Sequence, residues 1–594
     1  MRSSFSHLGL IILLLFGAFW LASSALDQQS FWGDEGWSMW AVGGRNPLET
    51  LRRVGDDVHP PLYFVLLDGW IALAGESVYA VRMLSLLFGL IGLAATFALA
   101  RRLFDRQTGL IALGLSGTTS FWVYYTREAR MYTLLLALGV LATWAYLRWL
   151  EDSSRRRTLI YALLLALLPY THYHGALMIA THGLHLLLTH PRRWRQWCAP
   201  ATLAALLYAP WIPLGLRQIQ EHPDGPFAIP IPTSRQTITG LIGHLIGGHW
   251  GLLPLPFAAV AIGWRIRRQT RVFVLLVIWL ILTPGIVFWV NAEIMPFYQR
   301  RYVIAILPAM ILVQAYGLRW IPWRWAAVAL LGVVMVGQVR SYDSLWPPKP
   351  SWKPALARMV AARDPAEPIF TLIIPNSVEA YYDRQLGIRQ GTVFDLNDHS
   401  LDPAALVKSV EDAPAVWVAM PANLYATWNV IALLDAGGSA TYRDSAANFV
   451  LYRFEPGDTD DLFFQFGDLI AYRGAVGEQF VAHAGDTLCM ELPLMAVAAL
   501  PPEGRYSAGL HLVGDSNQVI SQWDGGVGVY AAGENFILQP CLTIPDSTPG
   551  WDYHLVLVIY DWMTGDRLGL LDMANPAAPV GWLDTLVIGV VKVR

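Results

Sequence analysis

The chain has 594 residues, of which 55% are hydrophobic and 15% charged, whereas soluble domains usually carry about 25% charged residues. Its formal net charge of −3 gives no sign of a nucleic-acid partner. Three cysteines, Cys198, Cys489 and Cys541, are too few for a disulfide scaffold and lack the spacing of a metal site. Cys489 and Cys541 could pair if they lie outside the cytoplasm, and two buried free thiols are the equal alternative.

The first part of the chain consists of apolar runs that are long enough to cross a membrane. A membrane-spanning helix needs roughly 17–25 mostly apolar residues. The runs are residues 8–26, 80–100, 108–125, 130–150, 158–171, 175–189, 198–216, 250–264, 272–290, 302–318 and 324–340. They predict a polytopic α-helical membrane domain over residues 1–340, with about eleven transmembrane helices.

The runs are separated alternately by loops that are rich in arginine and loops that are not. In membrane proteins the cytoplasmic loops are enriched in Lys and Arg. The basic loops are Arg101–Arg106, Arg148–Arg157, Arg192–Arg195, Arg265–Arg271 and Arg319–Arg324. All five face one side if the N-terminus is cytoplasmic. The tail from Ser341 then lies outside, so we predict a multi-pass protein of the cell membrane (plasma or inner) with N-in, C-out topology.

Two apolar segments near the N-terminus are ambiguous. Leu8–Trp20, followed by the small residues Ala22–Ala25, has the pattern of a cleaved signal peptide. We expect a retained helix instead, because Asp34 and Glu35 look like a site placed just beyond a span. Pro60–Ala74 is too short to span and suits an interfacial helix within an external loop, residues 27–79.

The sequence of the tail, residues 341–594, predicts two soluble domains outside the membrane. Residues 341–457 alternate between helical and strand-like stretches and predict a small α/β domain. The stretches are Ala355–Ala362 and Ala404–Val410 as helices, and Ile369–Ile374 and Ala415–Ala419 as strands. This domain has no glycine-rich phosphate loop, so nucleotide binding is not supported.

Residues 458–594 predict a β-sandwich, because short β-type runs alternate with turn signals. The runs are Ser507–Val513, His554–Tyr560 and Thr585–Val593, and the turn signals are Trp523–Gly526 and Thr564–Asp566. Four aromatic residues of this domain are candidates for stacking on sugars, although core or sheet-edge positions are the simpler explanation. They are Trp523, Tyr530, Trp551 and Trp562.

Five groups of polar residues fall at the outward ends of the apolar runs, which predicts one polar site at the outer face. They are Asp34-Glu35, His59-Pro60-Pro61, Thr126–Tyr132, Thr171–His174 and Pro296–Tyr302. Adjacent residues point in different directions, so Asp34 and Glu35 are expected to have separate tasks. One carboxylate can act as general base on an acceptor hydroxyl, although an exposed acidic loop would explain the pair alone.

Arginines at a membrane end that should carry few positive charges suggest an anion site. Arg127 and Arg130 share a face if they lie in one helix, and Arg300 and Arg301 stand between Tyr298 and Tyr302. Arginine binds phosphate oxygens through paired hydrogen bonds and stays charged near a membrane. Snorkelling to lipid phosphates is the alternative. The further candidates for substrate binding are His59, Tyr132, His172 and His174.

These motifs together resemble the protein O-mannosyltransferase family and its bacterial relatives, which include the aminoarabinose transferases and belong to the GT-C superfamily. The resemblance covers residues 1–340. It rests on Asp34-Glu35, His59–Leu62, Thr126–Tyr132 and Arg300–Pro308. It implies an inverting transfer from a polyprenyl-phosphate sugar at the outer face. Asp34 would be the catalytic base with Glu35 in the acceptor site, and Arg127, Arg130 and Arg301 would hold the donor phosphate near His59.

The chain departs from these relatives at two points. His59 stands where the aminoarabinose branch has lysine, which argues against lipid A as acceptor. The soluble part is C-terminal, rather than between late spans as in eukaryotic-type protein mannosyltransferases, which puts a protein acceptor in doubt. The acceptor is thus an unknown glycan, lipid or protein. We expect no obligatory cofactor, and the resemblance leaves a divalent metal open because relatives differ in this respect.

Two other function classes remain as alternatives to a glycosyltransferase. A flippase or transporter for lipid-linked sugars would also need outward arginines, but it should show paired half-repeats, and the sequence shows no internal repeat. A membrane-anchored carbohydrate-binding envelope protein would use the β-sandwich and would not need Asp34 or Arg301. The sugar and the oligomeric state are not specified by the sequence.

Overall fold

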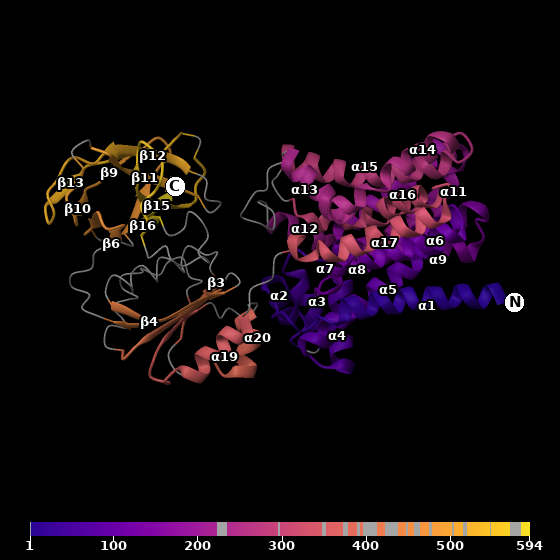
Figure 1. Ribbon diagram of the computed structural model, residues 1–594, viewed down its shortest axis with the longest axis horizontal. Helices are drawn as coiled ribbons and strands as arrows, with labels where there is room; N and C mark the ends of the chain where they lie inside the picture. Colours follow the sequence, from indigo (N-terminus) through magenta and orange to yellow (C-terminus); the bar gives the residue numbers. More distant parts are fainter. Residues whose placement is uncertain are drawn as a thin grey trace. The chain divides into compact units, whose positions relative to one another are not determined.

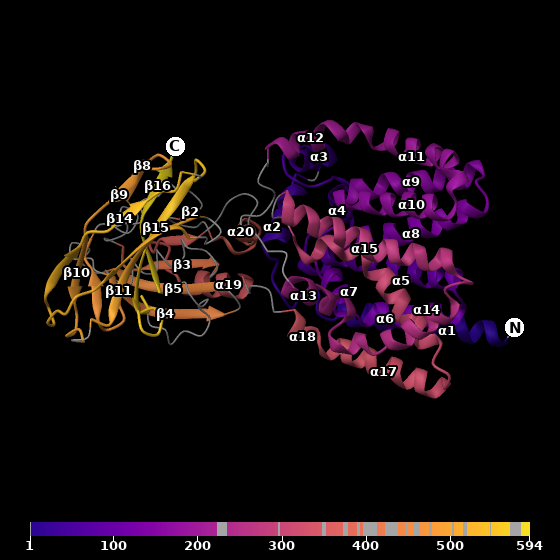
Figure 2. The same cartoon turned by 90° about the horizontal axis from the view of Figure 1, so that it is seen from above.

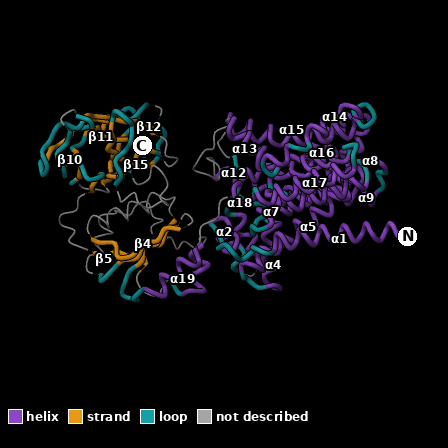
Figure 3. Tube along the Cα trace, in the orientation of Figure 1, coloured by secondary structure: helices purple, strands orange, loops and turns teal. Residues whose placement is uncertain are grey.

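The structure is a computed structural model that describes most of the chain. The described residues are 2–44, 46–221, 235–294, 298–346, 352–371, 378–388, 393–395, 413–421, 438–446, 449–456, 464–474, 478–501, 504–514, 519–546, 548–570 and 584–594. They form two compact units. The first contains Met1–Gln29 and Trp37–Pro348, and the second contains Ser30–Gly36 and Lys349–Arg594. In the described residues, the first unit is helical and the second holds the strands (Figure 3).

The first half of the helical unit runs from α1 to α10 (Figure 1). Its elements are α1 (Arg2–Ser23), α2 (Gly33–Ala41), α3 (Pro47–Gly55), α4 (Leu62–Ala74), α5 (Val78–Leu103), α6 (Arg106–Thr118), α7 (Ser120–Thr126), α8 (Tyr132–Glu151), α9 (Arg155–Thr171), η1 (Tyr173–Gly175) and α10 (Ala176–Thr189). Side chains of Ser77 and Asp105 cap the N-termini of α5 and α6 by accepting hydrogen bonds from backbone N–H groups.

The second half of the unit has shorter helices joined by breaks. Its elements are η2 (Pro191–Arg193), α11 (Trp194–Tyr208), η3 (Ala209–Trp211), α12 (Ile212–Glu221), α13 (Arg235–Ile246), η4 (His249–Leu252), α14 (Leu255–Arg265), α15 (Thr270–Glu293), η5 (Arg300–Ile306), α16 (Leu307–Arg319), α17 (Arg324–Arg340) and α18 (Tyr342–Leu345). Pro210 lies in the break between α11 and α12, where its missing N–H and fixed φ disfavour a continuous helix.

Each of the eleven apolar runs contains helix, as the sequence predicts. Within the described residues, five helical segments are long and apolar enough to cross a membrane, and a sixth is a pair bent by 81°. They are Val78–Leu103, Tyr132–Glu151, Pro191–Glu221, Thr270–Glu293, Arg300–Arg319 and the bent pair Thr237–Ile246 with His249–Arg265. The unit therefore has the character of a membrane domain. The number of spans and their N-in, C-out orientation stay predictions.

The run 108–125 is not one continuous helix. It divides into α6 and α7 at Thr119, which has the extended backbone angles φ −64° and ψ 131°. The segment Pro60–Ala74 is helical as expected: α4 follows Pro61 and ends at Gly75, whose φ of +84° favours glycine. Its placement at a membrane interface stays a prediction.

Two glycines let α5 approach its neighbours closely. A Cβ at Gly89 would lie 2.6 Å from the Thr126 side chain of α7, and one at Gly92 would lie 2.7 Å from Leu136 of α8. Small residues at helix contacts are typical of membrane bundles, where close packing stabilises the assembly. Figures 1 and 2 show α5 running beside α1 and α8. The segment after α7, which carries Arg127 and Arg130, is thereby held against α5.

The second unit begins with an α/β sheet of order β2-β1-β3-β5-β4. The elements are α19 (Trp352–Ala362), β1 (Ile369–Thr371), α20 (Val378–Leu386), β2 (Val393–Asp395), β3 (Val416–Pro421), β4 (Gly438–Ala446) and β5 (Phe449–Pro456). Strand β1 pairs in parallel with β2 and β3, and β5 pairs antiparallel with β3 and β4. Figure 2 shows β3, β5 and β4 side by side. The predicted helix Ala404–Val410 lies outside the described residues.

The remaining strands form two larger sheets and a short pair. They are β6 (Phe464–Phe466), β7 (Ile470–Tyr472), β8 (Glu478–Ala482), β9 (Thr487–Cys489), β10 (Leu492–Ala496), β11 (Tyr506–Val513), β12 (Val519–Gly526), β13 (Asn535–Leu538), β14 (Cys541–Thr543), β15 (Asp552–Asp561) and β16 (Thr585–Val593). The sheets have the orders β13-β10-β7-β6 and β12-β11-β15-β16-β8 and share one apolar core. This is the arrangement of a β-sandwich. The three-part division at 340 and 457 stays a prediction.

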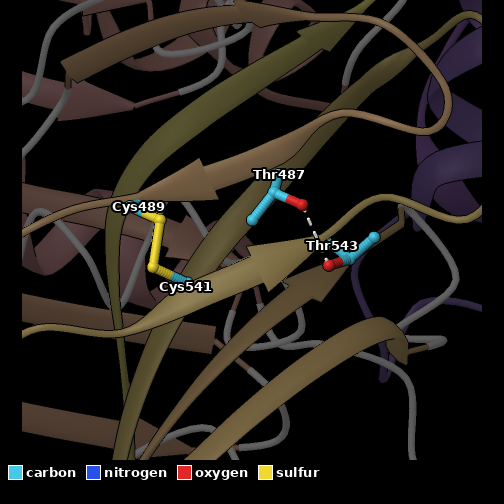
Figure 4. Close-up of a disulfide and its surroundings, with 4 residues drawn as sticks. All are labelled: Thr487, Cys489, Cys541 and Thr543. Carbon is cyan, nitrogen blue, oxygen red and sulfur yellow. Dashed lines mark hydrogen bonds between the residues drawn. A yellow bond between two sulfur atoms is a disulfide. The ribbon is translucent and has the colours of Figure 1, made fainter.

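The structure corrects one predicted turn of the sandwich and decides whether its two cysteines pair. Trp523–Gly526, predicted to be a turn, forms the last four residues of β12 and pairs with β11, so both glycines belong to the strand. Cys489 and Cys541 face each other on β9 and β14 and form a disulfide (Figure 4). Beside it, the hydroxyl groups of Thr487 and Thr543 are 3.1 Å apart.

Candidate active site

The two predicted catalytic carboxylates begin helix α2. Asp34 and Glu35 lie in its first turn, where negative charge is favourable to the helix dipole. Glu35 is fully buried and Asp34 is half-buried. Because neighbouring helical residues point about 100° apart, the two side chains face different surroundings. Both belong to the second unit, whereas α2 continues into the first unit from Trp37.

In the helical unit, a chain of three polar side chains links the loop after α3 to the segment before α8. Nδ1 of His59 lies 2.6 Å from Oδ2 of Asp57. Nε2 of the same ring lies 2.5 Å from Nη2 of Arg130. We refer to these residues as the Asp57–His59–Arg130 chain. It places His59 beside Arg130, as the two predicted substrate-binding positions require.

Aromatic rings enclose the guanidinium group of Arg130, which is only 2% exposed as a residue. Its carbon Cζ lies 5.6 Å from the ring centre of Trp37 and 5.7 Å from that of Phe64. Nη1 donates to Oγ of Ser38 over 3.2 Å. Cation–π contact of this kind strengthens when water is excluded, so the charge of Arg130 is held in a defined place.

A second group of residues lies at the turn between α9 and α10. Nδ1 of His172 accepts a hydrogen bond from the His174 backbone N–H over 3.2 Å, and it lies 3.0 Å from Nδ1 of His174. A nitrogen that accepts carries no proton, so the hydrogen-bond network assigns the proton of the neutral His172 ring to Nε2. His174 then carries its proton on Nδ1.

Tyrosines and an arginine complete this group. The ring of His174 stacks on Tyr302 with centroids 4.7 Å apart, and His172 lies 6.2 Å from Tyr132. Cζ of Arg301 lies 5.9 Å from the centre of Tyr132 and 6.0 Å from that of Tyr302. We call these five residues the His–Tyr–Arg301 group. The structure thus brings together residues that are 170 positions apart in the sequence (302 minus 132).

The electrostatics of His172 connect the two arrangements. Burial lowers the pKa of His172 well below its ordinary value, and electrostatic interactions with His174, His59, Arg301 and Arg130 lower it further. Charge–charge interactions weaken with distance, so both arrangements lie within electrostatic range of this ring. We therefore take the Asp57–His59–Arg130 chain and the His–Tyr–Arg301 group together as one candidate site, which is rich in cationic and aromatic side chains and suited to an anionic ligand.

Arg127 is directed elsewhere, and the expectation that it shares a helical face with Arg130 is wrong. Helix α7 ends at Thr126, so both arginines lie in the non-helical link to α8. Arg127 donates to the carbonyl oxygens of Leu21 and Ala22 over 2.6 and 3.1 Å. These carbonyls belong to the C-terminal turn of α1, where intrahelical donors run out. Its assignment as a phosphate ligand stays a prediction.

Tyr298 and Arg300 have partners other than the residues of the main site. The backbone N–H of Tyr298 donates to Asn291 over 2.7 Å, and burial raises the pKa of Tyr298 to about 12 despite the nearby Arg300 charge. Nη1 of Arg300 lies 3.0 Å from Nε2 of His244. Pro296 and Phe297 lie outside the described residues.

The sequence patterns did not single out Asp57, Trp37, Ser38 or Phe64, although all four contact His59 or Arg130. One local signal was present: Asp57 stands two residues before His59, a spacing at which a turn can bring the side chains together. The aromatic contacts come from tertiary packing. In the described part of the chain, no group of three His, Cys, Asp or Glu side chains is placed to hold a metal ion.

The fold has counterparts among solved structures. ArnT from Cupriavidus metallidurans in the apo state has a TM-score of 0.50 and 14% identity, covering 75% of this chain and 98% of that one. The same protein bound to undecaprenyl phosphate has a TM-score of 0.49, 14% identity and the same coverage. Archaeoglobus fulgidus AglB, with an inhibitory peptide and a dolichol-phosphate, has a TM-score of 0.43 and 10% identity, covering 100% and 99%.

The likeness to apo ArnT shows a shared fold, a helical core followed by a β-rich region. Residues 58–214 match the dolichyl-phosphate-mannose-protein mannosyltransferase family. The resemblance drawn from the sequence motifs is therefore confirmed. The matched segment contains His59, Arg127, Arg130, Tyr132, His172 and His174. No curated protein matches this chain.

Proposed function

We propose that the protein is a membrane glycosyltransferase that moves a sugar from a polyprenyl-phosphate carrier to an acceptor hydroxyl at the outer membrane face. The observation that carries this proposal is the pair of cationic and aromatic arrangements, Arg130 beside His59 and Arg301 beside Tyr132 and Tyr302. Much of this site lies in the segment that matches the mannosyltransferase family. Multi-pass membrane placement follows from the apolar helices, and an external C-terminal unit agrees with the Cys489–Cys541 disulfide.

The donor class follows from the charge of the site. A lipid-linked sugar phosphate is an anion with an apolar tail, so it would reach a cationic site at a membrane end from the bilayer. Arg130 and Arg301 would hold the phosphate, since guanidinium groups match phosphate oxygens and keep their charge when buried. Tyr132 and Tyr302 flank Arg301 and would fix its direction.

The reaction is a direct displacement at C1 of the sugar. Asp34 accepts the proton of the acceptor hydroxyl, whose oxygen then forms a bond to C1 from the face opposite the leaving group. The bond from C1 to the phosphate oxygen breaks, its electron pair stays with the lipid phosphate, and the configuration inverts. Glu35 contacts the acceptor. The developing phosphate charge is stabilised by the preorganised arginines.

The other predicted residues have supporting roles. His172 presents an Nε2–H that can donate to a phosphate or sugar oxygen. His174 supports His172 and packs on Tyr302. Tyr298, Arg300 and Arg127 would shape the rim of the site. We expect transfer without an obligatory divalent metal, which addition of a chelator would test.

The proposal is tested by transfer from radiolabelled polyprenyl-phosphate hexoses in membranes that contain the wild-type chain or Asp34→Asn. Asp27→Asn is the matched control, because Asp27 is exposed and lies seven residues earlier, beyond the end of α1. Expression levels are equalised by immunoblot. Label entering an acceptor fraction with the wild type and Asp27→Asn, but not with Asp34→Asn, supports the proposal.

Other outcomes separate the alternatives. Equal transfer by Asp34→Asn and the wild type removes Asp34 as base and points to Glu35. Movement of labelled lipid between bilayer leaflets without transfer would favour a flippase. Glycan binding by the second unit, unaffected by Asp34→Asn and Arg301→Ala, would favour the carbohydrate-binding envelope protein.

A further inference from the structure

We propose that Asp57 is a positioning residue for the donor phosphate: it fixes the tautomer of His59, and His59 in turn fixes the guanidinium group of Arg130. The inference rests on the proposed function, because it assigns Arg130 to the phosphate of a lipid-linked donor. The sequence motifs predict that His59 binds the substrate directly. In this inference it instead accepts a hydrogen bond from an arginine that binds the substrate.

The contact between Asp57 and His59 determines where the ring proton lies. An ionised carboxylate has no proton to donate. Nδ1 of His59, 2.6 Å from Oδ2 of Asp57, must therefore carry the hydrogen. In a neutral imidazole the other nitrogen, Nε2, then has a lone pair.

The contact between His59 and Arg130 requires that lone pair. The guanidinium nitrogens of arginine are donors only, and Nη2 of Arg130 lies 2.5 Å from Nε2 of His59. A proton on Nε2, from the other tautomer or from a charged ring, would set two N–H groups against each other. Asp57 therefore decides whether His59 can accept from Arg130.

The remaining contacts of the chain agree with a positioning role. Ser38 accepts from Nη1 of Arg130 while His59 accepts from Nη2, so both ends of the guanidinium plane are held. These contacts use two of the five N–H donors of an arginine. The rings of Trp37 and Phe64 lie against Arg130 and also against His59.

The titration of Asp57 is consistent with a permanent acceptor. Burial raises the pKa of Asp57, but its hydrogen bond with His59, a backbone hydrogen bond and the charge of Arg130 act in the opposite direction, and the net pKa is lowered. Asp57 therefore stays ionised near neutral pH.

The test is a double-mutant cycle on the full-length protein in membranes, with Asp57→Ala, His59→Ala and both together. The measured quantity is kcat/KM for a polyprenyl-phosphate hexose, alongside KM for the acceptor. Asp57→Ala should lower donor kcat/KM by about 10-fold to 100-fold, as for residues that orient a ligand-binding group. In the His59→Ala background the same change should have less than about a twofold effect, because Asp57 acts through His59.

Asp56 provides a matched control in the same turn. Its carboxylate contacts Arg217 and Arg52, not His59, and its side chain is 49% exposed. Asp56→Ala should leave donor kcat/KM within about twofold of wild type. Equal losses from Asp57→Ala in both His59 backgrounds, or loss of acceptor affinity instead, would overturn the positioning role and leave the proposed function standing.

A second readout needs no transfer activity. Ring ¹⁵N spectra of the purified protein, with His59 assigned by His59→Gln, report which nitrogen carries the proton. Wild-type His59 should show the Nδ1–H form, and Asp57→Asn should shift it toward Nε2–H, because an amide can also donate. If the wild type transfers no sugar, the proposed function fails, and this spectrum alone decides the inference: an unchanged tautomer in Asp57→Asn overturns it.

Discussion

The imidazole ring of His174 stacks on the phenol ring of Tyr302, with centroids 4.7 Å apart and planes 17° apart. The contact joins the turn between α9 and α10 to η5, and the rings of Tyr132 and Tyr302 both lie near His172, with centroid distances of 6.2 and 5.5 Å. Both histidines are kept neutral by their surroundings, so the charge of this site comes from arginines, whose ionisation does not change with physiological pH.

The neutrality of His174 predicts a pH-dependent stability. Burial lowers the pKa of His174 from 6.5 to about 4. Between these values the unfolded chain binds the proton and the folded chain does not, so the stabilisation is complete above pH 6.5 and is lost as pH falls toward 4. The loss is roughly 3 kcal/mol at most.

Thermal unfolding of the detergent-purified protein between pH 8 and 4.5 measures this effect. The wild-type Tm should fall below pH 6.5, and the Tm of His174→Gln should fall less steeply. His483→Gln serves as control, because that histidine is exposed. Parallel pH dependence in wild type and His174→Gln would contradict the prediction.

The turn that carries both histidines depends on Gly175. A Cβ at this position would lie 2.5 Å from the carbonyl oxygen of Leu168, and the same oxygen accepts from the His172 N–H over 3.0 Å. Gly175→Ala should therefore displace His172, destabilise the protein by about 1–3 kcal/mol and lower transfer activity.

Gly139→Ala is the comparison for that variant. The added Cβ would be 3.8 Å from Met178, an ordinary contact, and alanine is the better helix former. Tm and transfer rate should match or exceed wild type. Similar losses in the two variants would show that the close approach at Gly175 is not the cause.

Replacement by alanine should lower mainly the stability at Arg127 and mainly the activity toward the donor at Arg130. Arg127→Ala removes two hydrogen bonds to the end of α1 and should lower stability by about 1–3 kcal/mol. Arg130→Ala should mainly raise KM and lower kcat for the donor. Donor kinetics and Tm, measured on both variants, distinguish these effects. A donor defect in Arg127→Ala without a change in Tm would restore it as a phosphate ligand.

The disulfide predicts a redox-dependent stability of the second unit. Cys489 and Cys541 are 52 positions apart, and closing a loop of that length stabilises the folded state by about 4 kcal/mol at most. Protein isolated from cells should take up thiol reagent at the exposed Cys198 alone, and at all three cysteines after reduction. The variant Cys198→Ser removes the labelling at Cys198, so that any remaining label reports on Cys489 and Cys541. Labelling of Cys489 without reductant would argue against an external tail.

Much of the fold could be predicted because it depends on local patterns. The apolar runs are helical, and strands such as β16, Thr585–Val593, lie where β-type runs occur. The error at Trp523–Gly526 arose because glycines were taken as a turn signal, whereas pairing with β11 keeps them extended. The break at Thr119 was missed because hydropathy does not record backbone direction.

The site could be predicted only as a set of residue types at one membrane face. Composition and spacing placed His59, Arg130, His172 and Arg301 at the outward ends of helices. They gave no distances between segments far apart in the chain. Arg127 shows the limit: its spacing from Arg130 suggests one shared face, but the end of α7 sends the two side chains to different partners.

By itself, the sequence determined which segments are apolar enough to be membrane helices, where charged residues interrupt them, and which motifs resemble those of the mannosyltransferase family. These properties are local, because the cost of placing polar groups in lipid is incurred residue by residue. Only the tertiary structure decided that Asp57 faces His59, that His59 faces Arg130, and that Tyr302 covers His174. Hydrogen bonds and ring stacking act over a few ångströms, so they are fixed by how the helices pack.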